Sequence, residues 1–214
     1  MSAHPISKFR TAVTAGILVA AALAATILPA SAAATAPVRY AQTGWAGYVW
    51  PTASHTVTAS LRLPAAHATG TAGAAFWVGF GTGPGIEQTG FTANITGGHL
   101  RWSSWYELYP SPAVTFGRPA ATGDYVTMTV TYRGGGWYTL TLKDTTRRWT
   151  ASVTKHTSVS SLGLAEATTE AYGPAPAHFA PARFYNLPTT AGRTYTLPWA
   201  HLSALTRHAF TVSW

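Results

Sequence analysis

Short apolar segments alternate with turn residues along most of the chain, and this pattern predicts β-strands. In residues 125–132 and 137–142, apolar side chains alternate with Thr or Tyr, so one face of each strand would be buried. Further strands are predicted at residues 57–63, 75–80, 100–106 and 149–153. Turn residues rich in Gly and Pro separate them at 83–85, 96–98, 109–112 and 134–136. Short strands at this spacing predict an all-β fold, a sandwich of two sheets.

The segment 162–171 is ambiguous, because its Ala, Leu and Glu content also suits a helix. Glu166 and Glu170 are four residues apart, which is close to one helical turn and is also an even number along a strand. We therefore expect the two glutamates on one face in either conformation.

The N-terminal residues have the features of a secretory signal peptide. Lys8 and Arg10 precede an almost wholly apolar stretch at 12–29, and Ala30-Ser31-Ala32 provides the small residues that signal peptidase needs. An uncleaved membrane anchor is the alternative, since about 18 apolar residues can just span a bilayer. We predict a signal peptide at 1–32, a flexible leader at 33–39 and one domain at 40–214, secreted to the extracellular space and without a membrane contact after cleavage.

Charge is scarce and not clustered. Charged residues make up 9% of the chain, far below the roughly 25% usual for soluble domains. The net charge of +8 is dispersed, with no basic run longer than Arg147-Arg148, and this argues against nucleic-acid binding. The chain has no Cys, which excludes disulfides, thiol nucleophiles and Cys-bound zinc.

Few kinds of catalytic chemistry remain open to this sequence. Its acidic residues are Glu87, Glu107, Asp124, Asp144, Glu166 and Glu170. There is no Gly-x-Ser-x-Gly motif, and the eight His are isolated, so neither a serine hydrolase nor a metal site is favoured, although linear sequence does not exclude a triad. A pair of glutamates on one face suits general acid and base work in mildly acidic solution, because repulsion keeps a proton on one of them. Two solvated glutamates are the plainer alternative.

Several motifs resemble the glutamic peptidase (eqolisin, scytalidoglutamic peptidase-like) family. They are Phe76-Trp77-Val78-Gly79-Phe80-Gly81, Ile86-Glu87-Gln88-Thr89-Gly90, Trp105-Tyr106-Glu107-Leu108-Tyr109-Pro110 and Ala165-Glu166-Ala167-Thr168-Thr169-Glu170. Upstream, residues 44–49 and 57–64 are similar to the first two strands of that family. The resemblance covers most of residues 44–185. It implies an antiparallel β-sandwich of two curved sheets (concanavalin-like), with a cleft across one sheet and with residues 162–171 as a strand.

The resemblance also implies site residues and an activity. The catalytic residues of that family fall on Gln88 and Glu170, and Trp77, Trp105, Glu107 and Glu166 would bind substrate or support the cleft. Glu170 would activate a water that attacks a peptide carbonyl, and Gln88 would orient the water and stabilise the oxyanion. The expectation is a monomeric endopeptidase that acts on proteins or peptides at acidic pH, without a metal or other cofactor.

This chain departs from the family in ways that favour a second hypothesis. Gly81 and Ser103 stand where the family has acidic residues, and Glu87 stands where it has an apolar one. These losses, together with nine Trp and ten Tyr, suit a decayed, non-catalytic sandwich that binds polysaccharide or cell-surface material through exposed aromatic rings.

Overall fold

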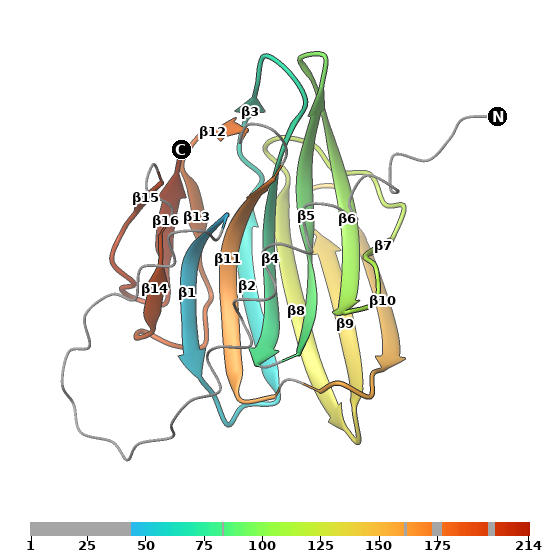
Figure 1. Ribbon diagram of the computed structural model, residues 1–214. Coiled ribbons are helices and arrows are strands. Elements are labelled where there is room, and N and C mark those ends of the chain that lie inside the picture. The colour runs from blue at the N-terminus through green and yellow to red at the C-terminus, as the bar shows by residue number, and fades with distance from the viewer. Residues whose placement is uncertain (1–43, 83, 161, 173–176, 197–199) are drawn as a thin grey trace.

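Two antiparallel sheets, one of seven strands and one of four, form the body of the computed structural model (Figure 1). It describes residues 44–82, 84–160, 162–172, 177–196 and 200–214, and the predicted signal peptide and leader lie outside them. The described residues form strands, turns and loops without a helix, which agrees with the all-β prediction. Accordingly, this part of the chain offers no apolar helix that could cross a bilayer.

The larger sheet has the strand order β14-β1-β11-β4-β5-β6-β7. In that order its strands are β14 (Arg193–Tyr195), β1 (Trp45–Pro51), β11 (Leu164–Tyr172), β4 (Ala72–Thr82), β5 (Gly85–Thr96), β6 (His99–Tyr109) and β7 (Val114–Thr115). Of the central strands, β4 and β5 are consecutive and pair as a hairpin, whereas β11 comes from a distant part of the chain, so its contacts depend on the whole fold.

The smaller sheet has the order β10-β9-β8-β2 and lies behind the larger one in Figure 1. Its strands are β10 (Trp149–His156), β9 (Trp137–Asp144), β8 (Tyr125–Gly134) and β2 (Thr56–Arg62). A two-stranded sheet of β12 (His178–Phe179) and β3 (Ala66–His67) and a three-stranded sheet of β13 (Ala182–Phe184), β16 (Phe210–Ser213) and β15 (His201–Leu202) complete the fold.

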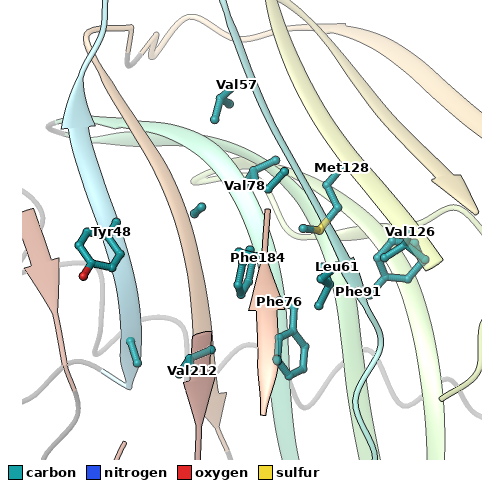
Figure 2. Close-up of a cluster of buried hydrophobic side chains, with 14 of the residues drawn as sticks. Tyr48, Val57, Leu61, Phe76, Val78, Phe91, Val126, Met128, Phe184 and Val212 are labelled. Atoms are coloured by element: carbon teal, nitrogen blue, oxygen red, sulfur yellow. The ribbon is translucent and has the colours of Figure 1, made fainter. Parts of the chain in front are cut away.

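The main core lies between the two large sheets and is built by strict alternation. In β8, Val126, Met128 and Val130 are buried and belong to this core. Phe76 and Val78 of β4 belong to the same cluster, and Figure 2 shows them with Val126 and Met128. Thr127, Thr129 and Thr131 occupy outward positions of β8, and their hydroxyls pair with those of β2, as between Thr58 and Thr129 at 2.8 Å. Burial of one face and solvation of the other is the arrangement that the sequence predicted for this strand.

Residues 162–171 form most of a strand, β11, and not a helix. The strand lies between β1 and β4 in the centre of the larger sheet, so tertiary pairing overrides the helical propensity of its Ala and Leu residues. Glu166 and Glu170 therefore lie on one face, as expected. The concanavalin-like character of the sandwich stays a prediction.

Candidate active site

The outer face of the seven-stranded sheet carries most of the residues that the sequence singled out. Paired residues of neighbouring strands share a face, and Gly79 of β4 pairs with Glu166 of β11 on one side and with Gln88 of β5 on the other. Gln88 in turn pairs with Glu107 of β6. A single row across the sheet thus contains Glu166, Gly79, Gln88 and Glu107.

Glu170 lies on the same face, four residues beyond Glu166 along β11, which is two periods of the pleat. It pairs with Trp45 of β1 and with Ala75 of β4. Trp77 and Trp105 also have the parity of this face, since they are two residues from Gly79 and Glu107 along their strands. Trp45, Ala75, Trp77 and Ile86 form a second buried cluster, separate from the main core, and Trp105 and Tyr109 pack against it.

Gln88 and Glu107 form a short, buried hydrogen bond. Gln88 Nε2 donates to Glu107 Oε2 at 2.6 Å, and the two residues are 6% and 7% exposed. Loss of water around Glu107 and repulsion by Glu170 raise its pKa to about 7, against the bond from Gln88, which lowers it. Gln88 Oε1 is buried and has no protein partner. The amide therefore has one end fixed and the other unpaired.

Glu170 is set among indole rings. The residue as a whole is partly exposed, but its carboxyl group is surrounded by protein, and this loss of water raises its pKa. The indole N–H groups of Trp45 and Trp77 act in the opposite direction, because nearby donors favour the carboxylate. Trp77 Nε1 is buried and makes no hydrogen bond of normal geometry. It therefore lowers the pKa of Glu170 by electrostatic attraction over a longer distance. The rings of Trp45 and Trp77 pack edge to face, with their centroids 5.6 Å apart.

Glu166 is more deeply buried, at 4% exposure, and its Oε2 atom has no hydrogen-bond partner. Burial raises its pKa to about 8, and repulsion by Glu170 contributes. Glu170 thus raises the pKa of both Glu107 and Glu166 by repulsion through space.

Glu87 takes no part in this face. It neighbours Gln88 in sequence, but successive residues of a strand point to opposite sides, and Glu87 is fully buried on the core face opposite Phe80 and Leu108.

Two residues of the face were not predicted from the sequence as site residues. The sequence places Trp45 only in the first strand, and it gives Thr92 no role. Thr92 Oγ1 accepts a hydrogen bond from Trp105 Nε1 at 2.9 Å, which fixes the ring that closes this side of the face. Trp45 and Thr92 reach this face only through the register of the paired strands. The residues next to them in sequence do not indicate that register.

The chemistry available here is that of carboxyl and amide groups. Within the described residues there is no group of three or more His, Asp or Glu placed to hold a metal ion. A carboxyl group near an amide can take a proton from water and offer an N–H to a developing oxyanion.

Comparison with known proteins identifies the family of this chain. Residues 43–198 match the model of the peptidase A4 family. The chain therefore belongs to the peptidase A4 family, and by that membership it is a glutamic-type endopeptidase. A search of curated proteins finds no match.

Solved structures of similar fold carry the same family names. Scytalido-glutamic peptidase with a peptide-based transition state analogue aligns with a TM-score of 0.66 and 22% identity, over 81% of this chain and 98% of that one. SCP-B, a member of the eqolisin family in complex with the tripeptide Ala-Ile-His, gives 0.61 and 20%, over 81% and 98%. Aspergilloglutamic peptidase from Aspergillus niger gives 0.56 and 22%, over 66% and 98%. At these identities the similarity establishes the fold.

Proposed function

We propose that the protein is a secreted endopeptidase that hydrolyses peptide bonds at acidic pH with Gln88 and Glu170. The observation that carries the proposal is the position of Glu107, which is hydrogen-bonded to Gln88 and electrostatically coupled to Glu170 on one face of the sheet. Secretion rests on the signal-peptide features of residues 1–32, and we expect the mature protein to act as a monomer on proteins or peptides, with no nucleic-acid partner.

In the proposed reaction, the ionised Glu170 takes a proton from water, and the resulting hydroxide attacks the scissile carbonyl carbon. Gln88 Nε2 has a second hydrogen beyond the one given to Glu107, and this N–H is available to the tetrahedral oxyanion. One such donor is worth roughly 10²- to 10³-fold in rate. When the C–N bond breaks, Glu170 returns the proton to the leaving amine, so the carboxylate is regenerated.

The carboxyl groups around Glu170 explain why acidic pH would favour this reaction. Glu107 and Glu166 have pKa values of about 7 and about 8, so both are neutral in acidic solution. The face then carries little negative charge to oppose the oxyanion. Activity should rise as Glu170 ionises and fall again as pH passes the pKa of Glu107, because each new negative charge on the face destabilises the oxyanion.

The experiment is cleavage of denatured casein by the purified mature protein from about pH 2 to about pH 8, a range that spans the Glu and His titrations. We expect an acid-side optimum that Glu170→Gln and Gln88→Ala both abolish. Asn94→Ala is the control for Gln88→Ala, since Asn94 lies on the same strand and face, six residues away. Glu87→Gln is the control for Glu170→Gln because it makes the same change on the opposite face, provided that circular dichroism shows it folded.

Cleavage by folded Glu170→Gln at the wild-type rate at every pH would reject the mechanism. The polysaccharide-binding alternative gains little support from the aromatic side chains. Trp45 and Trp77 are buried, and of the described Trp residues only Trp137, at 48% exposure, is strongly exposed. Retention on insoluble glycans without any proteolysis would favour that alternative.

A further inference from the structure

Glu166 sits in a space that exists because residue 81 is glycine. A Cβ atom built on Gly81 would lie 2.0 Å from Glu166 Oε1 and 3.2 Å from its carboxyl carbon. A real Cβ could occupy that position only if the carboxyl group moved, so the Glu166 carboxyl group fills the space of the missing side chain. Ile86 closes the other side of this space, at 3.5 Å from the same point.

The direction of the side chain is informative. Glu166 pairs with Gly79, whereas its carboxyl group lies against Gly81, two residues further along β4. Glu170 pairs with Ala75, in the other direction along the same strand. The seat on Gly81 therefore holds the Glu166 carboxyl group away from Glu170, and a side chain at position 81 would push it back toward the rest of the face.

Among the residues that the structure describes, no cation faces Glu166 on its own strand or on the strands next to it. Its own strand contributes Thr168 and Glu170 on this face, and β4 contributes the uncharged Trp77, Gly79 and Gly81. On β1 it faces Val49, beyond which lies the exposed Arg193 of β14. On β5 it faces the neutral Gln88, beyond which lies Glu107 of β6. Because a buried carboxylate needs a charged or hydrogen-bonding partner, this environment favours the protonated acid.

We propose that Glu166, seated on Gly81, is a positioning residue that stays protonated and so leaves the negative charge of the face on Glu170. The inference rests on the proposed function, because it names what keeps Glu170 in its reactive state. Its pKa of about 8, raised by burial and by Glu170, agrees with the geometric argument. The proton equilibrium is simple: Glu170 releases its proton to solvent first, and Glu166 releases its own only at higher pH.

The chain is well suited to a direct test, because it contains only four glutamates, Glu87, Glu107, Glu166 and Glu170. Protein labelled with ¹³C at the Glu δ-carbon should give four carboxyl resonances, which single Glu→Gln variants assign. In the wild type we expect the Glu166 resonance to titrate after that of Glu170. Glu170→Gln should lower the midpoint of Glu166 by roughly 0.5 to 1 pH unit, because a nearby charge has been removed.

The converse variant gives the discriminating result. Glu166→Gln should leave the midpoint of Glu170 unchanged, since Glu166 is already neutral while Glu170 titrates. A Glu166 resonance that titrates first, or a Glu170 midpoint that falls in Glu166→Gln, would overturn the proposal. The wild-type order of titration decides the matter even if Glu166→Gln does not fold, because the other three resonances can be assigned without it.

Two further readouts separate this role from simple packing. On the alkaline side, kcat/KM should fall with a limiting slope of about −2 in the wild type, from Glu107 and Glu166, and of about −1 in Glu166→Gln. Gly81→Ala should displace the carboxyl group and shift the Glu166 midpoint, whereas Gly70→Ala, at a glycine with nothing within 4 Å, should not. Unchanged slopes or an unshifted midpoint would contradict the inference.

The titrations also keep this inference distinct from the proposed function. If the protein cleaves no substrate but Glu170 ionises before Glu166, the peptidase mechanism fails and the charge arrangement stands. If cleavage follows Glu170 and the order of ionisation is reversed, the mechanism stands and the role of Glu166 fails.

Discussion

Gln88 is held in one orientation by a side chain, Glu107. Gln88 Nε2 faces Glu107 Oε2 at 2.6 Å, and this oxygen accepts the bond both in the carboxylate and in the neutral acid whose proton is on the other oxygen. This leaves Gln88 Oε1, which is buried and has no protein partner, directed elsewhere. The pairing thus orients the amide before any substrate arrives, and such preorganisation is what an oxyanion donor needs.

The pairing predicts different effects of two substitutions at Glu107. Glu107→Gln retains a carbonyl oxygen that can accept from Gln88 Nε2, whereas Glu107→Leu removes the acceptor and leaves a buried N–H unpaired. We expect kcat to fall roughly tenfold or more in Glu107→Leu, and an unpaired buried donor to cost about 1–3 kcal/mol of stability. Glu107→Gln should lose much less kcat and much less stability.

The measurement is kcat and KM at the acid-side optimum, with thermal unfolding of each variant in the same buffer. At that pH the wild-type Glu107 is itself neutral, so Glu107→Gln is a close match to it in charge. Equal kcat values for the Leu and Gln variants would show that the hydrogen bond does not orient Gln88 for catalysis.

At the scale of the strands, glycines allow close approach on the site face. A Cβ on Gly79 would lie 2.9 Å from Gln88 Cβ and 2.7 Å from the carbonyl oxygen of Glu87. A Cβ on Gly90 would lie 2.6 Å from Trp77 Cβ. Gln88 and Trp77 therefore each occupy space across from a residue without a side chain. The glycines of the motifs are explained by packing between β4 and β5, in addition to their frequent use in turns.

This packing predicts that Gly79→Ala damages both stability and the site. The added methyl group meets backbone as well as Gln88 Cβ, so β4 and β5 must separate, at a cost of about 1–3 kcal/mol. The shift would also move Gln88 relative to Glu107. Chemical denaturation and cleavage assays should show both losses in Gly79→Ala, and neither in Gly70→Ala, where the new methyl group meets nothing within 4 Å. A fully stable Gly79→Ala would contradict the close approach of the strands.

The same strands show what sequence reasoning could and could not reach. The half-solvated β8 and β9 were predicted because their alternation is clear. β5 was not predicted as a strand, because it is buried on both faces and contains Gln88, Thr92 and two glycines, so no alternation is visible. Gln88 and Glu170 were selected from motifs alone, and their presence on one face depends on the register of β11, β4 and β5. The short C-terminal strands, such as β13 and β15, gave no pattern to detect.

Over the whole molecule, the acidic residues are mostly inside and the basic ones mostly outside. Glu87, Glu107, Glu166, Asp124 and Asp144 are all buried, and Glu170 is only partly exposed. Asp124 has a cation, Arg147, which forms an ion pair with it, and the pKa of Asp144 is raised by burial. The Arg and Lys residues that the structure describes are all exposed, on a surface with few acidic groups to balance them.

This distribution predicts that the folded protein is more stable in acid than near neutrality. Glu107 and Glu166 have pKa values of about 7 and about 8 in the folded protein and ordinary values near 4.5 when unfolded. Between these values the folded state binds more protons than the unfolded state, so the free energy of unfolding falls as pH rises. The contribution is fully present below about pH 4.5 and is lost as pH passes about 7 and then about 8.

The measurement is urea unfolding at about pH 5, 6, 7 and 8 in about 0.2 M salt, which screens repulsion between surface cations. We expect a fall of a few kcal/mol across this range for the wild type, and a much flatter profile for Glu107→Gln combined with Glu166→Gln, which have no proton to lose. Repulsion between surface cations is weakened by salt, whereas the buried carboxyl groups are screened little. A wild-type stability that rises from pH 5 to pH 8 would show that the surface charge dominates and that the two glutamates ionise without cost.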